Sequence, residues 1–208
     1  MLTSILTPVG HGHNPKTSRA AWFRLAALHS LGAVASAVAV GAILAMLASS
    51  VRARGINTWS LGYWGILFVT VIYLPRQLGW TNFPRLLQST RQVPREWAYD
   101  YPRSLTALLF GLGLGSGLYT RIVVPTYYLL FLWPLLVPNI ALAPAMWGTY
   151  ALARSLNVWW LACASPLGDP FSHATRLISA LVQRASWIYR ANAVLLLAVA
   201  TFVVVGSR

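Results

Sequence analysis

The sequence predicts an all-α membrane protein, a bundle of about six transmembrane helices with an amphipathic interfacial helix before the last span. Of its 208 residues, 57% are hydrophobic and only 9% are charged. A soluble domain carries about a quarter charged residues, because water must hydrate its surface. Several apolar stretches are also long enough to cross a hydrocarbon core of about 30 Å. Lipid is therefore the expected solvent for most of these side chains.

A polar arm, residues 1–24, precedes the first predicted span, residues 25–48. At 1.5 Å per residue this apolar run crosses the bilayer once, and it is too long for the core of a signal peptide. The second predicted span, 59–74, begins with tryptophan, which anchors helix ends at the membrane surface. Pro75 is expected to end this helix.

The longest polar stretch, residues 76–103, is predicted to be a loop, because arginines, acids and prolines are dense in it. One short surface helix is expected near residues 85–92. The apolar region that follows would extend about 50 Å as one straight helix, well past the hydrocarbon core. Two shorter spans, 105–119 and 122–137, are therefore predicted. The alternative is one kinked crossing, which would give five spans in all.

A turn at Pro138 and Asn139 leads into the fifth predicted span, 140–164. Residues 171–190 then repeat polar side chains at spacings of three and four, which leaves one apolar face. This pattern is typical of a helix that lies in the headgroup plane or covers a bundle. The last predicted span is 191–205. One transmembrane domain, 25–208, thus follows the arm.

The charge is strongly positive, with 16 Lys and Arg against 3 Asp and Glu, a formal net charge of +13. The basic residues are scattered between apolar runs, which favours anionic lipid headgroups as partners over nucleic acid. Their excess on the arm and on the 76–103 loop places the N-terminus in the cytoplasm, in a prokaryotic cell membrane. Six spans would place three later arginines outside the cell, against this excess of positive charge in the cytoplasm, and five spans would place them inside: Arg176, Arg184 and Arg190.

Four glycines alternate along the third predicted span and form two overlapping GxxxG patterns: Gly111, Gly113, Gly115 and Gly117. In lipid, this spacing lets helix backbones come close. In one interpretation the glycines are a packing face, and Arg121 reaches the surface at a hairpin tip. In the other the helix is broken, and Thr120 and Arg121 line a polar pathway. Helices interrupted by glycine and proline are typical of transporter sites.

Arg154 lies well inside the fifth predicted span, where a charge is costly without a partner. It either pairs with a carbonyl or an anion on a solute pathway, or it reaches the interface, with Trp159 and Trp160 beside it. His29, near the start of the first span, either holds a haem or quinone or is hydrogen-bonded to a neighbouring helix.

Other reactive residues predict little chemistry. His11 and His13 lie close together on the arm, a pattern too weak to predict a metal site. Cys163, the only cysteine, cannot form an internal disulfide and is expected to be a small buried hydrophobe. Every acid lies outside the apolar runs, which disfavours proton-coupled antiport. A nucleophile–base pair is not evident, so an enzyme is not expected, and the cofactor is unknown.

Three segments resemble a pattern in small bacterial permease-like proteins: residues 91–97, residues 110–121 with the glycines, and residues 148–154. They are similar to the six-helix membrane module of the DsbD/CcdA type, within the LysE-type transporter group. That resemblance implies a scaffold of glycine-broken helices. Such modules carry electrons through an intramembrane cysteine pair. Here Thr120 and Arg121 stand where a cysteine is sought and Cys163 has no partner, so the thiol relay does not carry over.

Three functions follow as hypotheses. The first is a permease-like protein that moves, or helps to move, a small solute or anion. The second is a non-catalytic subunit of a larger membrane complex, respiratory or photosynthetic, with other membrane subunits as partners. The third is a redox protein that binds haem or quinone at His29.

Overall fold

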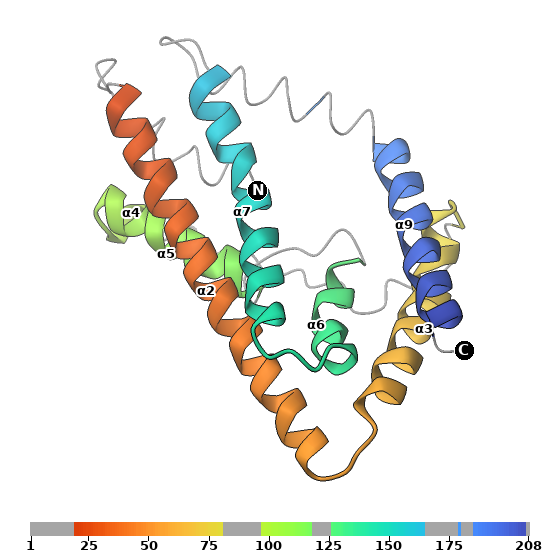
Figure 1. Cartoon of the computed structure of the whole chain (residues 1–208). Helices are drawn as coiled ribbons and strands as arrows, with labels where there is room; N and C mark the ends of the chain where they lie inside the picture. The colour runs from red at the N-terminus through yellow and green to blue at the C-terminus, as the bar shows by residue number, and fades with distance from the viewer. Residues whose placement is uncertain (1–18, 81–96, 118–125, 165–178, 180–184, 207–208) are drawn as a thin grey trace. The chain divides into compact units, whose positions relative to one another are not determined.

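The computed structural model describes residues 19–80, 97–117, 126–164, 179 and 185–206, and this part of the chain is helical without strands. Figure 1 shows the helices α2 (Arg19–Ala53), α3 (Thr58–Gln77), α4 (Trp97–Asp100), α5 (Arg103–Ser116), α6 (Tyr127–Leu136), α7 (Leu142–Ala164) and α9 (Ala185–Gly206). The all-α prediction is therefore confirmed for the described residues.

Three of these helices are long and apolar enough to cross a membrane, over Ala21–Ala53, Thr58–Pro75 and Trp187–Gly206. With 14 and 10 residues, α5 and α6 extend about 21 and 15 Å, less than a hydrocarbon core of about 30 Å. α7 has 23 residues but is not among the candidate spans. The prediction of six complete spans is thus supported for three segments, and the number six stays a prediction.

Two helix ends differ from the predicted ones. α2 covers 35 residues instead of the 24 or so of its apolar run, because the arginine- and alanine-rich flanks are good helix formers. α3 continues through Pro75, so the prediction that this proline ends the helix is wrong. Proline removes one helical N–H, but Leu78 still donates to the Leu74 carbonyl and Trp80 to the Pro75 carbonyl. Gly79, at φ 101°, then turns the chain away.

Several predicted segments lie outside the described residues. They are the surface helix near 85–92, the residues 118–125 with Thr120 and Arg121, and most of the amphipathic helix 171–190. α9 begins at Ala185, so residues 185–190 continue directly into the last span. The predicted boundary between Arg190 and Ala191 is therefore inside one helix, because no helix-breaking residue separates the two segments.

The chain divides into two compact units. The first unit comprises Met1–Val40, Thr90–Thr120 and Trp147–Gln183, and so contains the first part of α2, α4, α5 and most of α7. Along α7, four buried residues recur at spacings of four, four and three: Trp147, Ala151, Ser155 and Val158. This stripe is the inward face of the helix.

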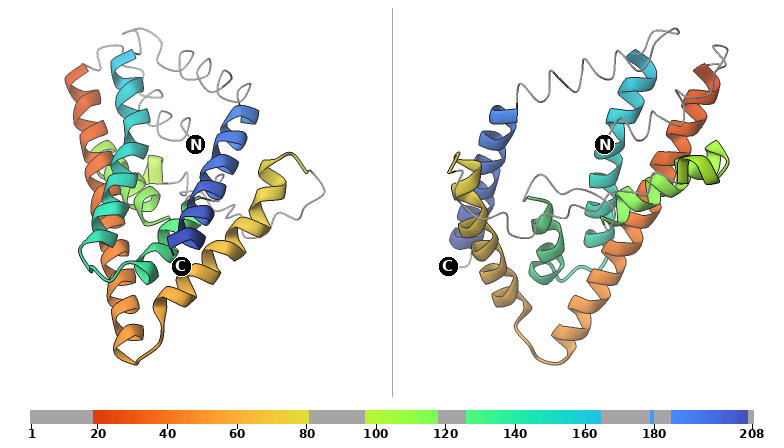
Figure 2. Two further views of the ribbon diagram at one scale, coloured as in Figure 1. Left: turned by 45° about the vertical axis from the view of Figure 1, so that its right-hand side comes forward. Right: turned by 180° about the vertical axis from the view of Figure 1, so that it is seen from behind.

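The second unit comprises Gly41–Ser89, Arg121–Met146 and Arg184–Arg208. In it α3 packs against α6 and α9, which Figures 1 and 2 show side by side. Glycines let α6 come close, since a methyl group on Gly62 would lie 2.7 Å from Leu136 and one on Gly65 would lie 2.9 Å from Leu132.

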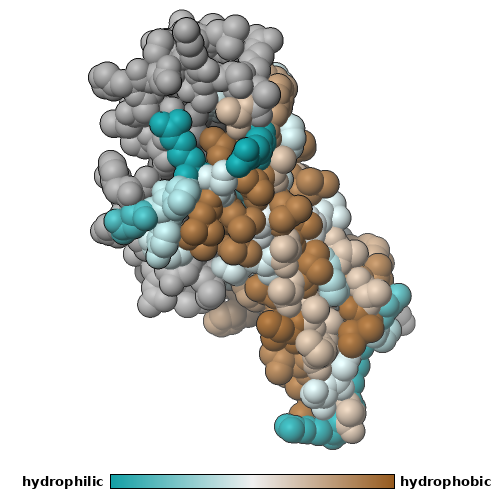
Figure 3. Space-filling view, turned by 90° about the vertical axis from the view of Figure 1, so that its left-hand side faces the viewer, coloured by the Kyte–Doolittle hydropathy of each residue, from teal (hydrophilic) through white to brown (hydrophobic). Residues whose placement is uncertain are grey.

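The exposed face of α3 is apolar, whereas its buried face is largely polar around one fully buried apolar residue, Ile66. Its buried stripe ends in Thr70, Tyr73 and Gln77, whose side chains are 5–7% exposed. Its opposite face carries side chains that are 49–68% exposed: Leu61, Trp64, Phe68 and Val71. A different face of the molecule is seen in Figure 3, and there too hydrophobic residues form most of the coloured surface. A helix of a water-soluble protein has the reverse pattern, so these faces fit a lipid environment.

Candidate functional site

The predicted glycine pair Gly111 and Gly115 lies against α2 in the first unit. A side chain on Gly111 would collide with the backbone carbonyl of His29, and one on Gly115 with the carbonyl of Ala33. Both are backbone atoms, which cannot move aside as the end of a flexible side chain can. These two glycines therefore allow the contact between α5 and α2.

The other two glycines of the overlapping patterns occupy different positions in α5. Gly113 is buried within α5. Gly117 has φ 74°, a left-handed conformation that glycine adopts without strain, and it caps the C-terminus of α5. Across the same contact, a methyl group on Gly32 of α2 would lie 2.5 Å from the carbonyl oxygen of Leu108. The close approach thus involves glycines of both helices.

His29 is almost completely buried, with 1% of its surface exposed. The backbone of Ala107 on α5 lies close to the imidazole, and the Arg154 guanidinium is near enough to interact with it electrostatically. Neither ring nitrogen has a hydrogen bond of standard distance and angle within the described residues. The first unit therefore brings together His29, Arg154 and the glycine pair. A haem or quinone at His29 would have to displace side chains that now cover it.

Arg154 is half-buried and lies over the ring of Tyr150, one turn earlier on α7, with 5.9 Å between the guanidinium carbon and the ring centre. The Tyr150 side chain also forms a hydrogen bond with it. The two tryptophans expected beside Arg154 at the interface point in different directions. Trp159 donates from its indole N–H to Ser30 Oγ on α2 at 2.8 Å, whereas Trp160 is 65% exposed.

The prediction that Cys163 is buried is wrong, because its side chain is exposed. It follows Leu152, Leu156 and Trp160 at spacings of four, four and three, and these three are 53–65% exposed. The cysteine thus belongs to the outward face of α7, opposite the stripe that ends at Val158.

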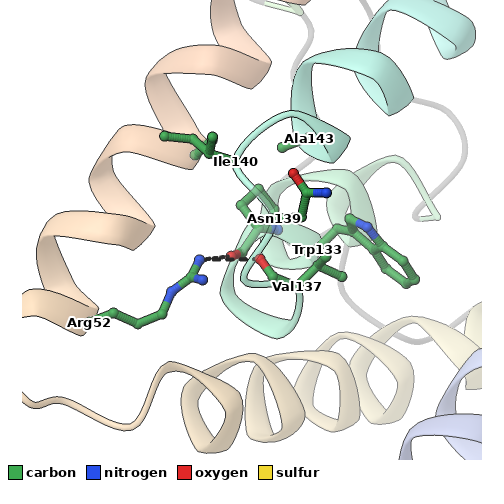
Figure 4. A pocket seen from close by; sticks show the side chains of 8 residues that line it. Arg52, Trp133, Val137, Asn139, Ile140 and Ala143 are labelled. Carbon is green, nitrogen blue, oxygen red and sulfur yellow. Dashed lines mark hydrogen bonds between the residues drawn. The ribbon is translucent and has the colours of Figure 1, made fainter.

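Arg52 in the second unit was not predicted to have a role, and Figure 4 shows it reaching the end of α6. Its Nη2 donates to the Pro134 carbonyl at 2.7 Å and to the Val137 carbonyl at 3.2 Å. A helical carbonyl at position 134 would normally accept from the N–H of residue 138. Pro138 has no N–H and favours the extended backbone seen at Val137, so α6 ends at Leu136 and the arginine supplies a donor to the Pro134 carbonyl. The prolines at 134 and 138 were the available sequence signal.

A small pocket surrounds this contact. Its lining residues are Ala45, Arg52, Trp133, Pro134, Val137, Asn139, Ile140 and Ala143. Asn139 accepts from the backbone N–H of Ala141 at 3.0 Å and so stabilises the start of α7. Because the guanidinium already binds two carbonyls, its hydrogen bonds hold the protein together rather than a ligand. Within the described ranges, no group of three or more His, Cys, Asp or Glu could hold a metal ion.

Comparison with known proteins gives a partial similarity. No family model and no solved structure match the chain. Over 155 residues, 74% of its length, it is 29% identical to the methylamine utilization protein MauF of Paracoccus versutus. It is 28% identical to the MauF protein of Paracoccus denitrificans over the same share of its length. The aligned regions cover 55% and 54% of those proteins, so the chain spans about half the length of the curated relatives it matches.

Proposed function

We propose that this chain is a multi-pass protein of a prokaryotic cell membrane that has an accessory role in the utilization of methylamine or a closely related small amine. The membrane part is carried by α3, whose exposed face is apolar and whose buried face is largely polar. The amine part is supported by the similarity to the MauF proteins over 74% of the chain.

The described polar contacts join helices to one another, as an accessory role requires. Trp159 bonds to Ser30, Arg52 to Pro134, and Thr126 Oγ1 to Asn192 Oδ1 at 2.8 Å. Hydrogen bonds between helices are a main source of specific packing in lipid, where burial of apolar surface gives little. The exposed apolar faces would then contact lipid or the helices of other membrane subunits.

A second candidate is a permease-like protein, with a pathway past Gly111–Gly117, Thr120, Arg121 and Arg154. One observation favours it, namely the half-buried arginine of α7 beside His29 in the first unit. An arginine inside a membrane bundle is typical of a substrate pathway. With a net charge of +13, such a pathway would suit an anion better than a methylammonium cation.

Further parts of the proposal concern scaffold and orientation. The scaffold would resemble the DsbD/CcdA-type module without its cysteine pair, with the N-terminus in the cytoplasm and anionic lipids around the basic loops. Binding of haem or quinone at His29 is the redox alternative. It predicts visible absorbance of the purified protein in the haem case, and a colourless preparation would end that version.

Deletion of the gene from its native host separates the accessory and permease roles. In both cases we expect growth on methylamine to be lost and growth on succinate to continue. Intact cells would then be tested for uptake of labelled methylamine, and broken cells for methylamine consumption. An accessory role predicts normal initial uptake with loss of consumption in broken cells. A permease predicts reduced uptake by intact cells and normal consumption in broken cells. Unchanged growth on methylamine would overturn the amine proposal as a whole.

Complementation with single variants tests the pathway residues. Arg121→Ala and Arg154→Gln would be compared with Arg103→Gln, a change of the same charge at an exposed position. The accessory role predicts that Arg121→Ala supports growth. For the anion version, proteoliposomes with the wild type and Arg121→Ala would be tested against a panel of anions. Equal leakage for every anion would count against a permease.

A further inference from the structure

The turn between α2 and α3 in the second unit carries a concentrated positive charge. Arg52 lies in the last turn of α2, and Arg54 follows at an exposed position. Gly55, at φ 77°, makes the turn, and its N–H donates to the Arg52 carbonyl at 2.9 Å. The only acid in the described ranges is Asp100, which belongs to the other unit. The described part of the second unit therefore offers this turn no carboxylate counter-ion.

An exposed apolar surface begins directly beside the two arginines. On α3 it starts at Trp59, which is 38% exposed, and continues along Leu61, Trp64, Phe68 and Val71, which are 49–68% exposed. On α2 it comprises Ile43, Met46 and Leu47, each 53–58% exposed. Positive charge at the end of an apolar stripe marks the level at which hydrocarbon meets headgroups, where arginine and tryptophan are enriched.

Arg54 is better placed than Arg52 to bind a ligand at this level. Arg52 uses Nη2 for the carbonyls of Pro134 and Val137, and its Nε for the carbonyl of Ala48 at 3.4 Å. It keeps its charge, but only the two N–H groups of Nη1 are left for another acceptor. The exposed guanidinium of Arg54 can present two parallel N–H groups to a phosphate.

We infer that the α2–α3 turn is a binding site for an anionic phospholipid. The headgroup phosphate pairs with Arg54 and is attracted by the charge of Arg52, while the acyl chains lie along the stripe from Leu61 to Val71. Charge complementarity selects the anionic headgroup, because a zwitterionic one carries a cation that the two arginines repel. The inference rests on the membrane part of the proposed function and is independent of the amine.

The test uses the full-length chain, purified in mild detergent and exchanged into nanodiscs of phosphatidylcholine with phosphatidylglycerol. Native mass spectrometry then counts the two lipids that stay bound. We expect enrichment of phosphatidylglycerol over its bulk share in the wild type, and about fivefold weaker retention in Arg54→Gln. Arg54→Lys should keep most of the preference. Arg103→Gln, at an exposed position in the first unit, is the matched control and should behave as the wild type.

The same experiment includes a change in the apolar stripe. Leu61→Asn should weaken retention of both lipids, because it acts on the acyl chains rather than on the headgroup. Equal retention of the two lipids by the wild type, or an equal preference in Arg54→Gln and the wild type, would overturn the inference. A reproducible acidic protein bound in place of lipid, and lost in Arg54→Gln, would also overturn it. Should the chain stay in solution without detergent, the membrane proposal itself fails, which is a distinguishable result.

Discussion

The backbone carbonyl of Pro134 accepts a 2.7 Å hydrogen bond from Nη2 of Arg52, a residue 82 positions earlier in the chain. The contact compensates for the missing N–H of Pro138 and joins the end of α2 to the end of α6. In an apolar environment an unpaired carbonyl is expensive, so one side chain here satisfies a group that the local sequence leaves without a donor.

Replacing Arg52 tests this compensation. Arg52→Leu should lower the free energy of unfolding by about 1.5–3 kcal/mol, the usual contribution of a hydrogen bond from a charged group. In a Pro138→Ala background the loss should be smaller, because Val137 is then free to become helical and the alanine can supply the N–H. Denaturation in detergent of the wild type, the Arg52→Leu and Pro138→Ala variants and the double variant measures how strongly the two changes are coupled. Arg54→Leu is the control for the removal of an arginine. If Arg52→Leu lowered the stability equally with and without the Pro138→Ala change, the explanation would be contradicted.

Because α5 contacts α2 through its glycines, we expect an alanine at this contact to change stability differently from an alanine at a glycine outside it. Gly111→Ala should destabilise the protein, because the new methyl group meets the His29 carbonyl. Gly206→Ala, with nothing within 4 Å, should be neutral or stabilising by up to about 1 kcal/mol from helix propensity. Apparent melting temperatures of the purified variants provide the measurement. A Gly111→Ala protein as stable as Gly206→Ala would show that the two backbones are not in contact.

Thr70 provides a test of the inward polar face of α3. Its hydroxyl is buried and has no hydrogen-bond partner among the described residues, unlike Ser155, which donates to the Ala151 carbonyl one turn earlier. An unpaired buried hydroxyl costs about 1–3 kcal/mol. The isosteric change Thr70→Val should therefore leave the melting temperature unchanged or raise it. Ser155→Ala, the comparison, should lower it, and a clear loss of stability in Thr70→Val would reveal a polar partner.

Cys163 can decide between six and five spans. With the N-terminus in the cytoplasm, six spans place the end of α7 outside the cell, and five spans place it inside. Because the thiol is exposed and is the only one in the chain, the native protein needs no engineering. In spheroplasts, six spans predict labelling by a membrane-impermeant maleimide, with Cys163→Ser as the blank. Labelling only after lysis would favour five spans.

Composition and hydropathy alone determined the helical class and three membrane-length segments. Both depend only on the length and hydropathy of continuous segments. With a rise of 1.5 Å per residue, a sufficiently long apolar run predicts a helix that can cross lipid. The GxxxG spacing likewise identified Gly111 and Gly115 as residues for which close approach matters. Helix ends were less predictable, as Pro75 shows, because a turn of α-helix tolerates one missing donor when later N–H groups continue the pattern.

Only the tertiary structure decided which groups meet. His29 and Arg154 are far apart in the chain, and no periodicity indicates that they share the first unit; the same holds for Trp159 with Ser30. In the sequence Arg52 is an ordinary loop arginine, and only the fold brings the unpaired carbonyl of Pro134 within its reach. Pairings of this kind depend on distances set by packing of whole helices, whereas the sequence specifies each helix with its faces but not the neighbour that each face meets.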